Sequence, residues 1–211
     1  EADLSGSNMT GADLTDADLT KATLYGVNLT GADLTNSQLA ESTLTTANLT
    51  TADLSGSNLR QVSAASANMT GADLTEADLT DVNLSNSTLS SAKLKNTDLT
   101  RANLNGTTAT SAKLTFVTAQ GSNLSNANLT SATLIGGDFN GSDMVLAHFD
   151  NATITHTDFT STLANYTTWT SATLTRPKFN GSDLTGANFT SSAITEFTAP
   201  GATLDNANFS N

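Results

Sequence analysis

Residues 11–20 read GADLTDADLT, and residues 71–80 read GADLTEADLT, which differs at a single position. The two stretches are sixty residues apart, and the residues between them keep the same phase. Self-similarity at a short fixed period is the signature of a repeat architecture, in which each unit buries its apolar side chains against its neighbours.

The period is five residues. Every fifth residue from Leu4 to Phe209 gives 42 positions, and Leu, Met, Phe, Ile or Trp fills 37 of them. The residue two places earlier is Ala, Ser, Thr, Val or Gly at all but two of the 42 sites, which hold Pro177 and Phe197. The remaining three places of each pentad are mostly polar. Alanine replaces the large residue at the other five positions: Ala64, Ala109, Ala119, Ala164 and Ala199.

A period of five fits neither a helix of 3.6 residues per turn nor a simple alternating strand. It fits short strand segments joined by corners, because residues two apart on a strand face the same side. The small and the large residue then both point inward, and the Gly, Asn, Asp or Ser that follows accommodates the corner. Four corners close a square coil of 20 residues, and successive coils stack at about 4.8 Å.

The pentads GADLT, DADLT and TANLT resemble the A(D/N)LXX motif of the pentapeptide-repeat family. The resemblance covers essentially the whole chain. It implies an all-β fold, a right-handed quadrilateral β-helix of about ten coils of 20 residues. We therefore expect a single uninterrupted solenoid domain over residues 1–211.

The 20-residue coil predicts which core residues stack. Phe139, Phe159 and Phe179 should form one aromatic column, and a second should stand on the opposite wall, with Trp169 as a core residue within it: Phe149, Trp169, Phe189 and Phe209. The small partner should be enlarged beside each core alanine, to limit the void left there. These partners are indeed larger than Ala or Ser: Val62, Thr107, Val117, Thr162 and Phe197.

Composition and motifs argue against several functions. The net charge is −12, with 8 Lys and Arg against 20 Asp and Glu, so direct binding of nucleic-acid phosphate is not expected. The chain has no Cys and no apolar run long enough for a membrane span. It has no catalytic or phosphate-binding motif. His148 and His156 fall on opposite walls and cannot share a metal. We expect no catalytic residue, cofactor or metal.

Three surface features are candidate sites. Asp13, Asp33, Asp53 and Asp73 are 20 residues apart and should stack as an acidic ladder, continued by Lys93 and Lys113. A cation or a basic partner would relieve the repulsion within the ladder. Alternatively, each Asp accepts hydrogen bonds from nearby backbone, as Asx residues do at turns.

The second feature is a set of apolar residues in normally polar, outward places, on neighbouring coils of one wall: Val145, Leu146, Leu163 and Tyr166. Contiguous exposed apolar surface marks a partner site. The third feature is a rank of Thr10, Thr30, Thr50 and Thr70, with flanking threonines in segments such as TIT and TWT. Flat threonine ranks resemble ice-binding surfaces, although β-propensity also explains Thr on exposed strands.

Three functional hypotheses follow. The first is a non-enzymatic scaffold, a rigid acidic rod that contacts an unidentified protein partner. The second is a DNA mimic that acts on a topoisomerase such as gyrase, although no pentad is interrupted by the projecting loops associated with that activity. The third is ice or surface binding. We also expect end-to-end or dimeric self-association through strand edges. The frequent NXT sequons favour a bacterial source, and cytoplasmic, periplasmic and extracellular locations all remain open.

Overall fold

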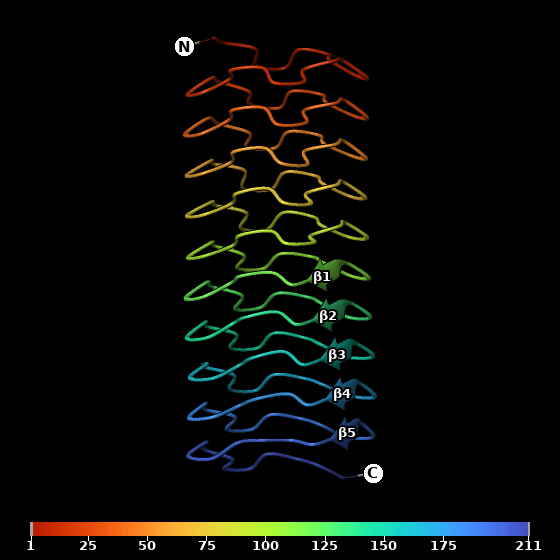
Figure 1. Cartoon of the computed structure of the whole chain (residues 1–211), viewed down its shortest axis with the longest axis vertical. Coiled ribbons are helices and arrows are strands. Elements are labelled where there is room, and N and C mark those ends of the chain that lie inside the picture. The colour runs from red at the N-terminus through yellow and green to blue at the C-terminus, as the bar shows by residue number, and fades with distance from the viewer. Residues whose placement is uncertain (1, 211) are drawn as a thin grey trace.

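The computed structural model describes residues 2–210, which wind into a stack of coils with the two ends at opposite poles (Figure 1). Each coil pairs with the next in parallel at a step of 20 residues, from Asp3 with Thr23 to Asn188 with Asn208. The predicted 20-residue coil and the all-β parallel solenoid are therefore confirmed. Among the described residues there is no helix long and apolar enough to cross a membrane.

Four walls enclose the core, and we number them by their outward residues. Wall 1 carries Asp3 and every twentieth residue after it, and walls 2, 3 and 4 start in the same way from Asn8, Asp13 and Asp18. The outward residue also makes the inter-coil bonds. On wall 3 the backbone N–H of Asp33 donates to the carbonyl of Ala12 at 2.9 Å, and its own carbonyl accepts from the N–H of Leu14 at 2.7 Å.

The flanking small and large residues point inward, as the pentad predicts. Ala32 and Leu34, on either side of Asp33, are 1% and 0% exposed. The alternation of a strand therefore explains why two of five residues are apolar and the residue between them is polar.

The corners explain the remaining two places. Every fifth residue from Gly6 to Asn206 has a φ between 52° and 72°. At most corners the N–H of the next small residue donates back across the turn, as Ser37 does to the carbonyl of Leu34 at 3.0 Å. A closing hydrogen bond with positive φ at the second central residue is the arrangement of a type II turn. Gly, Asn, Asp and Ser are frequent there because they tolerate this backbone conformation.

One corner changes along the rod. From Leu94 onward, the corner between walls 3 and 4 lacks the closing bond. From Lys113 onward, the chain before this corner is extended into five short strands, which pair in sequence order as a parallel sheet (Figure 1). Pro177 occupies this corner, where its missing N–H costs no turn bond. The five strands are β1 (Lys113–Thr115), β2 (Thr133–Ile135), β3 (Thr153–Thr155), β4 (Thr173–Thr175) and β5 (Ala193–Thr195).

The aromatic columns form as predicted. Phe159 stacks on Phe139 and on Phe179 with ring centroids 5.5 and 4.9 Å apart. The opposite column is also stacked, and Trp169 is fully buried within it between Phe149 and Phe189. The two columns meet edge to face across the core, at 5.5 Å between Phe159 and Trp169. Aromatic contact therefore fills the interior of the C-terminal half.

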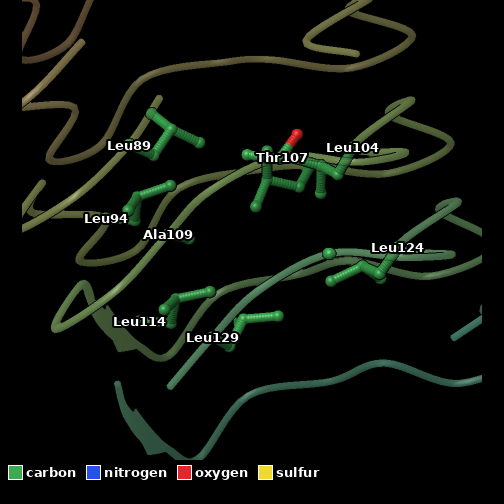
Figure 2. Close-up of a pocket in the computed structure, with 10 residues that line it drawn as sticks. Leu89, Leu94, Leu104, Thr107, Ala109, Leu114, Leu124 and Leu129 are labelled. Atoms are coloured by element: carbon green, nitrogen blue, oxygen red, sulfur yellow. The ribbon is translucent and has the colours of Figure 1, made fainter. Parts of the chain in front are cut away.

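The enlarged partner residues fill the space beside the core alanines to different extents. Beside Val62, Ala64 is fully buried, whereas Ala109 beside Thr107 borders an apolar cavity of about 20 Å³ (Figure 2). The Thr107 hydroxyl turns away to donate to the carbonyl of Leu84 at 2.9 Å. Thr107 therefore limits the void beside Ala109 without filling it, because a threonine branch is shorter than the missing leucine.

Candidate functional site

The structure brings Val145, Leu146, Leu163 and Tyr166 together as one surface, which we call the apolar corner patch. Leu163 lies on wall 1, and Leu146 and Tyr166 occupy the corner between walls 1 and 2 in consecutive coils. Val145 is half-buried, but Leu146, Leu163 and Tyr166 are 47%, 51% and 58% exposed. Large apolar side chains with this exposure are uncommon unless a partner covers them.

The backbone beneath the patch is fixed by inter-coil hydrogen bonds. The N–H of Leu146 donates to Asn165 at 3.0 Å, and that of Tyr166 donates to Thr185 at 2.9 Å. The Tyr166 ring lies over Gly186, where a Cβ atom would come within 2.6 Å of the ring. Because Gly186 has no Cβ atom, the Tyr166 ring can lie directly on the backbone of the next coil. The patch is therefore ordered in the absence of a partner.

Carboxylates frame the patch. Asp143 and Asp183 bridge to Leu163 from the coil on either side. Hydrogen bonds from the side chain of Thr185, from Asn165 and from the Thr185 backbone hold the pKa of Asp183 below its ordinary value. This aspartate is therefore ionised at neutral pH, and the patch combines apolar anchors with adjacent negative charge.

The acidic ladder is stacked as predicted, since Asp13, Asp33, Asp53 and Asp73 bridge in succession and Asp73 bridges to Lys93. One oxygen of each carboxylate is used locally: Asp33 Oδ1 accepts from the backbone N–H of Thr35 at 3.0 Å and from its hydroxyl at 2.6 Å. These hydrogen bonds lower the pKa of Asp33. The local-acceptor interpretation of the ladder therefore describes the geometry.

The two histidines lie apart and have different neighbours. His148 Nδ1 lies 3.0 Å from the Thr168 hydroxyl, whereas His156 Nε2 lies 3.3 Å from the guanidinium of Arg176. Within residues 2–210 no three His, Asp or Glu side chains are grouped in a way that could hold a metal ion.

The threonines of the rank on wall 2 form side-chain hydrogen bonds within the same wall. Thr10 and Thr50 donate their hydroxyl protons to Asn8 and Asn48 at 2.7 and 2.6 Å. The Asn-X-Thr sequence thus forms a local side-chain pair that fixes both rotamers.

Two exposed aromatic residues were not among the predicted site residues. Tyr25 and Phe116 are 55% and 57% exposed at corners. The signal that marks the apolar corner patch, a large apolar residue in a corner place, also marks them. Each stands on a different part of the rod from the patch.

The coil, the inward Ala and Leu, and the positive-φ corners are the structural counterpart of the A(D/N)LXX motif. Family models agree: one described as pentapeptide repeats matches residues 1–36, 28–63 and 67–106, and one described as a pentapeptide repeat region matches residues 112–189. The chain belongs to the pentapeptide-repeat family. The sequence has no significant match among curated proteins.

Solved pentapeptide-repeat structures include a strong structural match. HetL, a protein involved in heterocyst differentiation regulation in the cyanobacterium Nostoc sp. strain PCC 7120, is 26% identical over 98% of this chain and 88% of its own, with a TM-score of 0.81. QnrB1, a plasmid-mediated fluoroquinolone resistance protein, is 15% identical over 97% of this chain and 94% of its own, with a TM-score of 0.33. A thylakoid-lumen protein of Arabidopsis thaliana is 31% identical over 55% of this chain and 67% of its own, with a TM-score of 0.22.

Proposed function

We propose that this protein is a non-enzymatic binding scaffold that contacts a protein partner through the apolar corner patch. The observation that carries the proposal is the exposure of Leu146, Leu163 and Tyr166 side by side on a backbone fixed by inter-coil hydrogen bonds. A preorganised apolar surface loses little conformational entropy when it binds. Tyr is also among the residues that most often anchor protein interfaces.

The surroundings of the patch define the partner's chemistry. Asp143 and Asp183 stand above and below Leu163, so a binding segment gains most if basic residues flank its apolar side chains. We therefore propose a protein segment in which Leu, Ile, Val or an aromatic residue is flanked by Lys or Arg.

HetL supports a regulatory role carried out by contact. It shares the full-length solenoid with this chain, and it takes part in regulating differentiation. A rod whose side chains point away from one another brings few groups together for catalysis. Binding to a partner is the activity that such a surface performs best.

The test is a selection with a peptide library displayed on phage, using the purified protein as bait. A Leu163→Asp, Tyr166→Ser double variant serves for counter-selection, and circular dichroism confirms that it keeps the β-solenoid. We expect enriched peptides to carry apolar residues next to Lys or Arg and to lose binding to the variant. Peptides that bind both proteins equally, or a library without enrichment, would refute the proposal.

The other two hypotheses lack a specific observation in their favour. A DNA mimic needs an extended acidic surface, but the acidic ladder ends at Lys93 and Lys113. An ice-binding face needs a long uninterrupted rank of threonines, and on wall 2 the rank of Thr10 to Thr70 is followed by Ser90 and, further on, Asp150.

A further inference from the structure

Wall 3 carries a charge pattern that is complementary to itself. Along its central column the outward residues read four aspartates and then two lysines, each bridged to the next in parallel register: Asp13, Asp33, Asp53, Asp73, Lys93 and Lys113. We propose that two copies of this chain pack wall 3 against wall 3 in antiparallel orientation, so that the acidic ladder of each copy meets the lysines of the other.

The order of charges along the column is complementary to itself under a two-fold rotation. Consider a two-fold axis lying in the interface, perpendicular to both rods, at the level midway between Asp73 and Lys93. This operation keeps every column opposite itself and reverses its order. Asp73 then faces Lys93 of the partner subunit, and Asp53 faces Lys113 of the partner subunit. Because a two-fold interface is isologous, each of these ion pairs forms twice.

The charged groups on wall 3 remain accessible for these contacts. Lys93 lies 2.9 Å from Asp73 in its own chain and remains more than half exposed. Within residues 2–210, Lys95 and Lys113 form no ion pair. On the acidic side, Asp53 uses Oδ1 to accept from Ser55, at 2.9 Å from its N–H and 2.6 Å from its hydroxyl. Its second oxygen can therefore accept from a lysine of the other copy.

The same operation also matches the residues beyond the lysines. Asp33 and Asp13 come opposite Thr133 and Thr153 of the partner subunit. In the described part of the chain, the hydroxyls of Thr133 and Thr153 make no side-chain hydrogen bond, and a hydroxyl facing a carboxylate is a natural donor.

Charge favours wall 3 over wall 4 as the surface that pairs. A net charge of −12 opposes self-association through a uniformly acidic surface. On wall 4 the corresponding column contains five aspartates and a single lysine, so reversal sets acids mainly against acids and neutral residues: Asp18, Asp78, Asp98, Asp138, Asp158 and Lys178. The matched stretch of wall 3, from Asp13 to Thr153, spans seven coil steps, or about 34 Å at ~4.8 Å each. Exposed ion pairs are individually weak and screened by salt, so the dimer is salt-sensitive.

Sedimentation velocity of the full chain tests the association. At about 20 mM NaCl and a protein concentration of about 100 μM, we expect a dimer that dissociates when the NaCl is raised to about 500 mM. A monomer under both conditions would overturn the proposal.

Paired charge reversals test the wall. Lys93→Glu with Lys113→Glu makes the column wholly acidic, and Asp53→Lys with Asp73→Lys makes its centre wholly basic. We expect each variant alone to be monomeric and an equimolar mixture of the two to form a heterodimer. Arg60→Glu with Lys178→Glu, the same charge change on wall 4, should leave the wild-type dimer intact. A dimer that survives either reversal on wall 3, or a mixture that stays monomeric although both variants show the wild-type circular dichroism spectrum, would refute it.

Cross-linking tests the orientation, because the chain contains no natural cysteine. In the antiparallel arrangement, Asp53→Cys in one copy lies opposite Lys113→Cys in the other, so a short bis-maleimide should link a mixture of the two variants. It should link Asp53→Cys to itself much more weakly. Equal yields, or preferential linkage of like positions, would contradict the antiparallel arrangement.

Discussion

Phe149 and Trp169 stack face to face, with ring centroids 4.1 Å apart and ring planes 4° from parallel. The indole Nε1–H of Trp169 donates to the Thr167 hydroxyl at 2.8 Å, so the single polar atom of this ring is satisfied inside the core. A residue so placed should dominate the stability of the C-terminal half.

We therefore predict that Trp169→Ala lowers the free energy of unfolding by about 3–5 kcal/mol, the usual cost of removing a buried large aromatic ring. Urea unfolding followed by circular dichroism measures it. Tyr25→Ala is the control, because Tyr25 is a half-exposed surface aromatic and its loss should change the free energy by no more than about 0.5 kcal/mol. Equal costs for the two variants would show that Trp169 is not a core residue.

The cavity beside Ala109 predicts a stabilising substitution. Ala109→Leu restores the residue found one coil away on each side, at Leu89 and Leu129, which both line the cavity. Filling an apolar void recovers packing contacts, so we expect a gain of about 1 kcal/mol in thermal or urea unfolding. Ala64→Leu is the matched control: Val62 already closes that coil, and overpacking should cost about 1–3 kcal/mol. A loss of stability in Ala109→Leu would contradict the cavity.

The backbone conformation of Thr51 at its corner predicts a second stabilising substitution. Thr51 is β-branched and has a φ of 55°, a conformation that costs about 1–2 kcal/mol for a residue with a Cβ atom. Glycine removes that cost and adds about 0.5–1 kcal/mol of chain entropy, so Thr51→Gly should be neutral to stabilising by about 1 kcal/mol.

At the adjacent residue, Thr50, we expect glycine to have the opposite effect on stability. The hydroxyl of Thr50 donates to Asn48 at 2.6 Å, and its φ is not in the left-handed region. Thr50→Gly should therefore destabilise the protein by about 1 kcal/mol or more. If both glycine variants shifted the unfolding midpoint in the same direction, the corner assignment would be wrong.

Stability should fall at acid pH. Hydrogen bonds from the Thr35 side chain and backbone lower the pKa of Asp33 in the fold. A carboxyl group with a lowered folded-state pKa stabilises the protein above its unfolded value of about 4, and this contribution is lost as the pH falls through the folded value.

We therefore expect a melting temperature that is level down to about pH 5 and declines below about pH 4. Asp33→Asn keeps an oxygen that accepts from Thr35 but removes the titrating group, so its acid decline should be shallower than that of the wild type. A melting temperature that rises on acidification would mean that repulsion in the acidic ladder outweighs these hydrogen bonds.

The sequence predicts the fold almost completely, because each place in the pentad has one position in the coil. Leu34 and Ala32 point inward and Asp33 outward by strand alternation alone. The change in the corner between walls 3 and 4 from Leu94 onward was not predicted, since the five-residue period runs through it unchanged.

The candidate site was predicted as an exposed apolar cluster on one wall, whereas Leu146 and Tyr166 lie at the corner between walls 1 and 2. The period predicts that both side chains point outward, but it does not show what lies beneath them, such as Gly186 under the Tyr166 ring. The same period concealed Phe116, because a single aromatic residue in one pentad looks like a local variation until its corner is seen to face solvent.

The affinity of a selected peptide for matched variants tests the central claim most directly. Titration calorimetry compares the wild type, Tyr166→Ser in the apolar corner patch, and Tyr25→Ser, which removes an equally exposed tyrosine elsewhere on the rod. The account predicts at least a tenfold loss of affinity, equivalent to about 1.4 kcal/mol, for Tyr166→Ser and none for Tyr25→Ser. Equal affinity of all three proteins would contradict it.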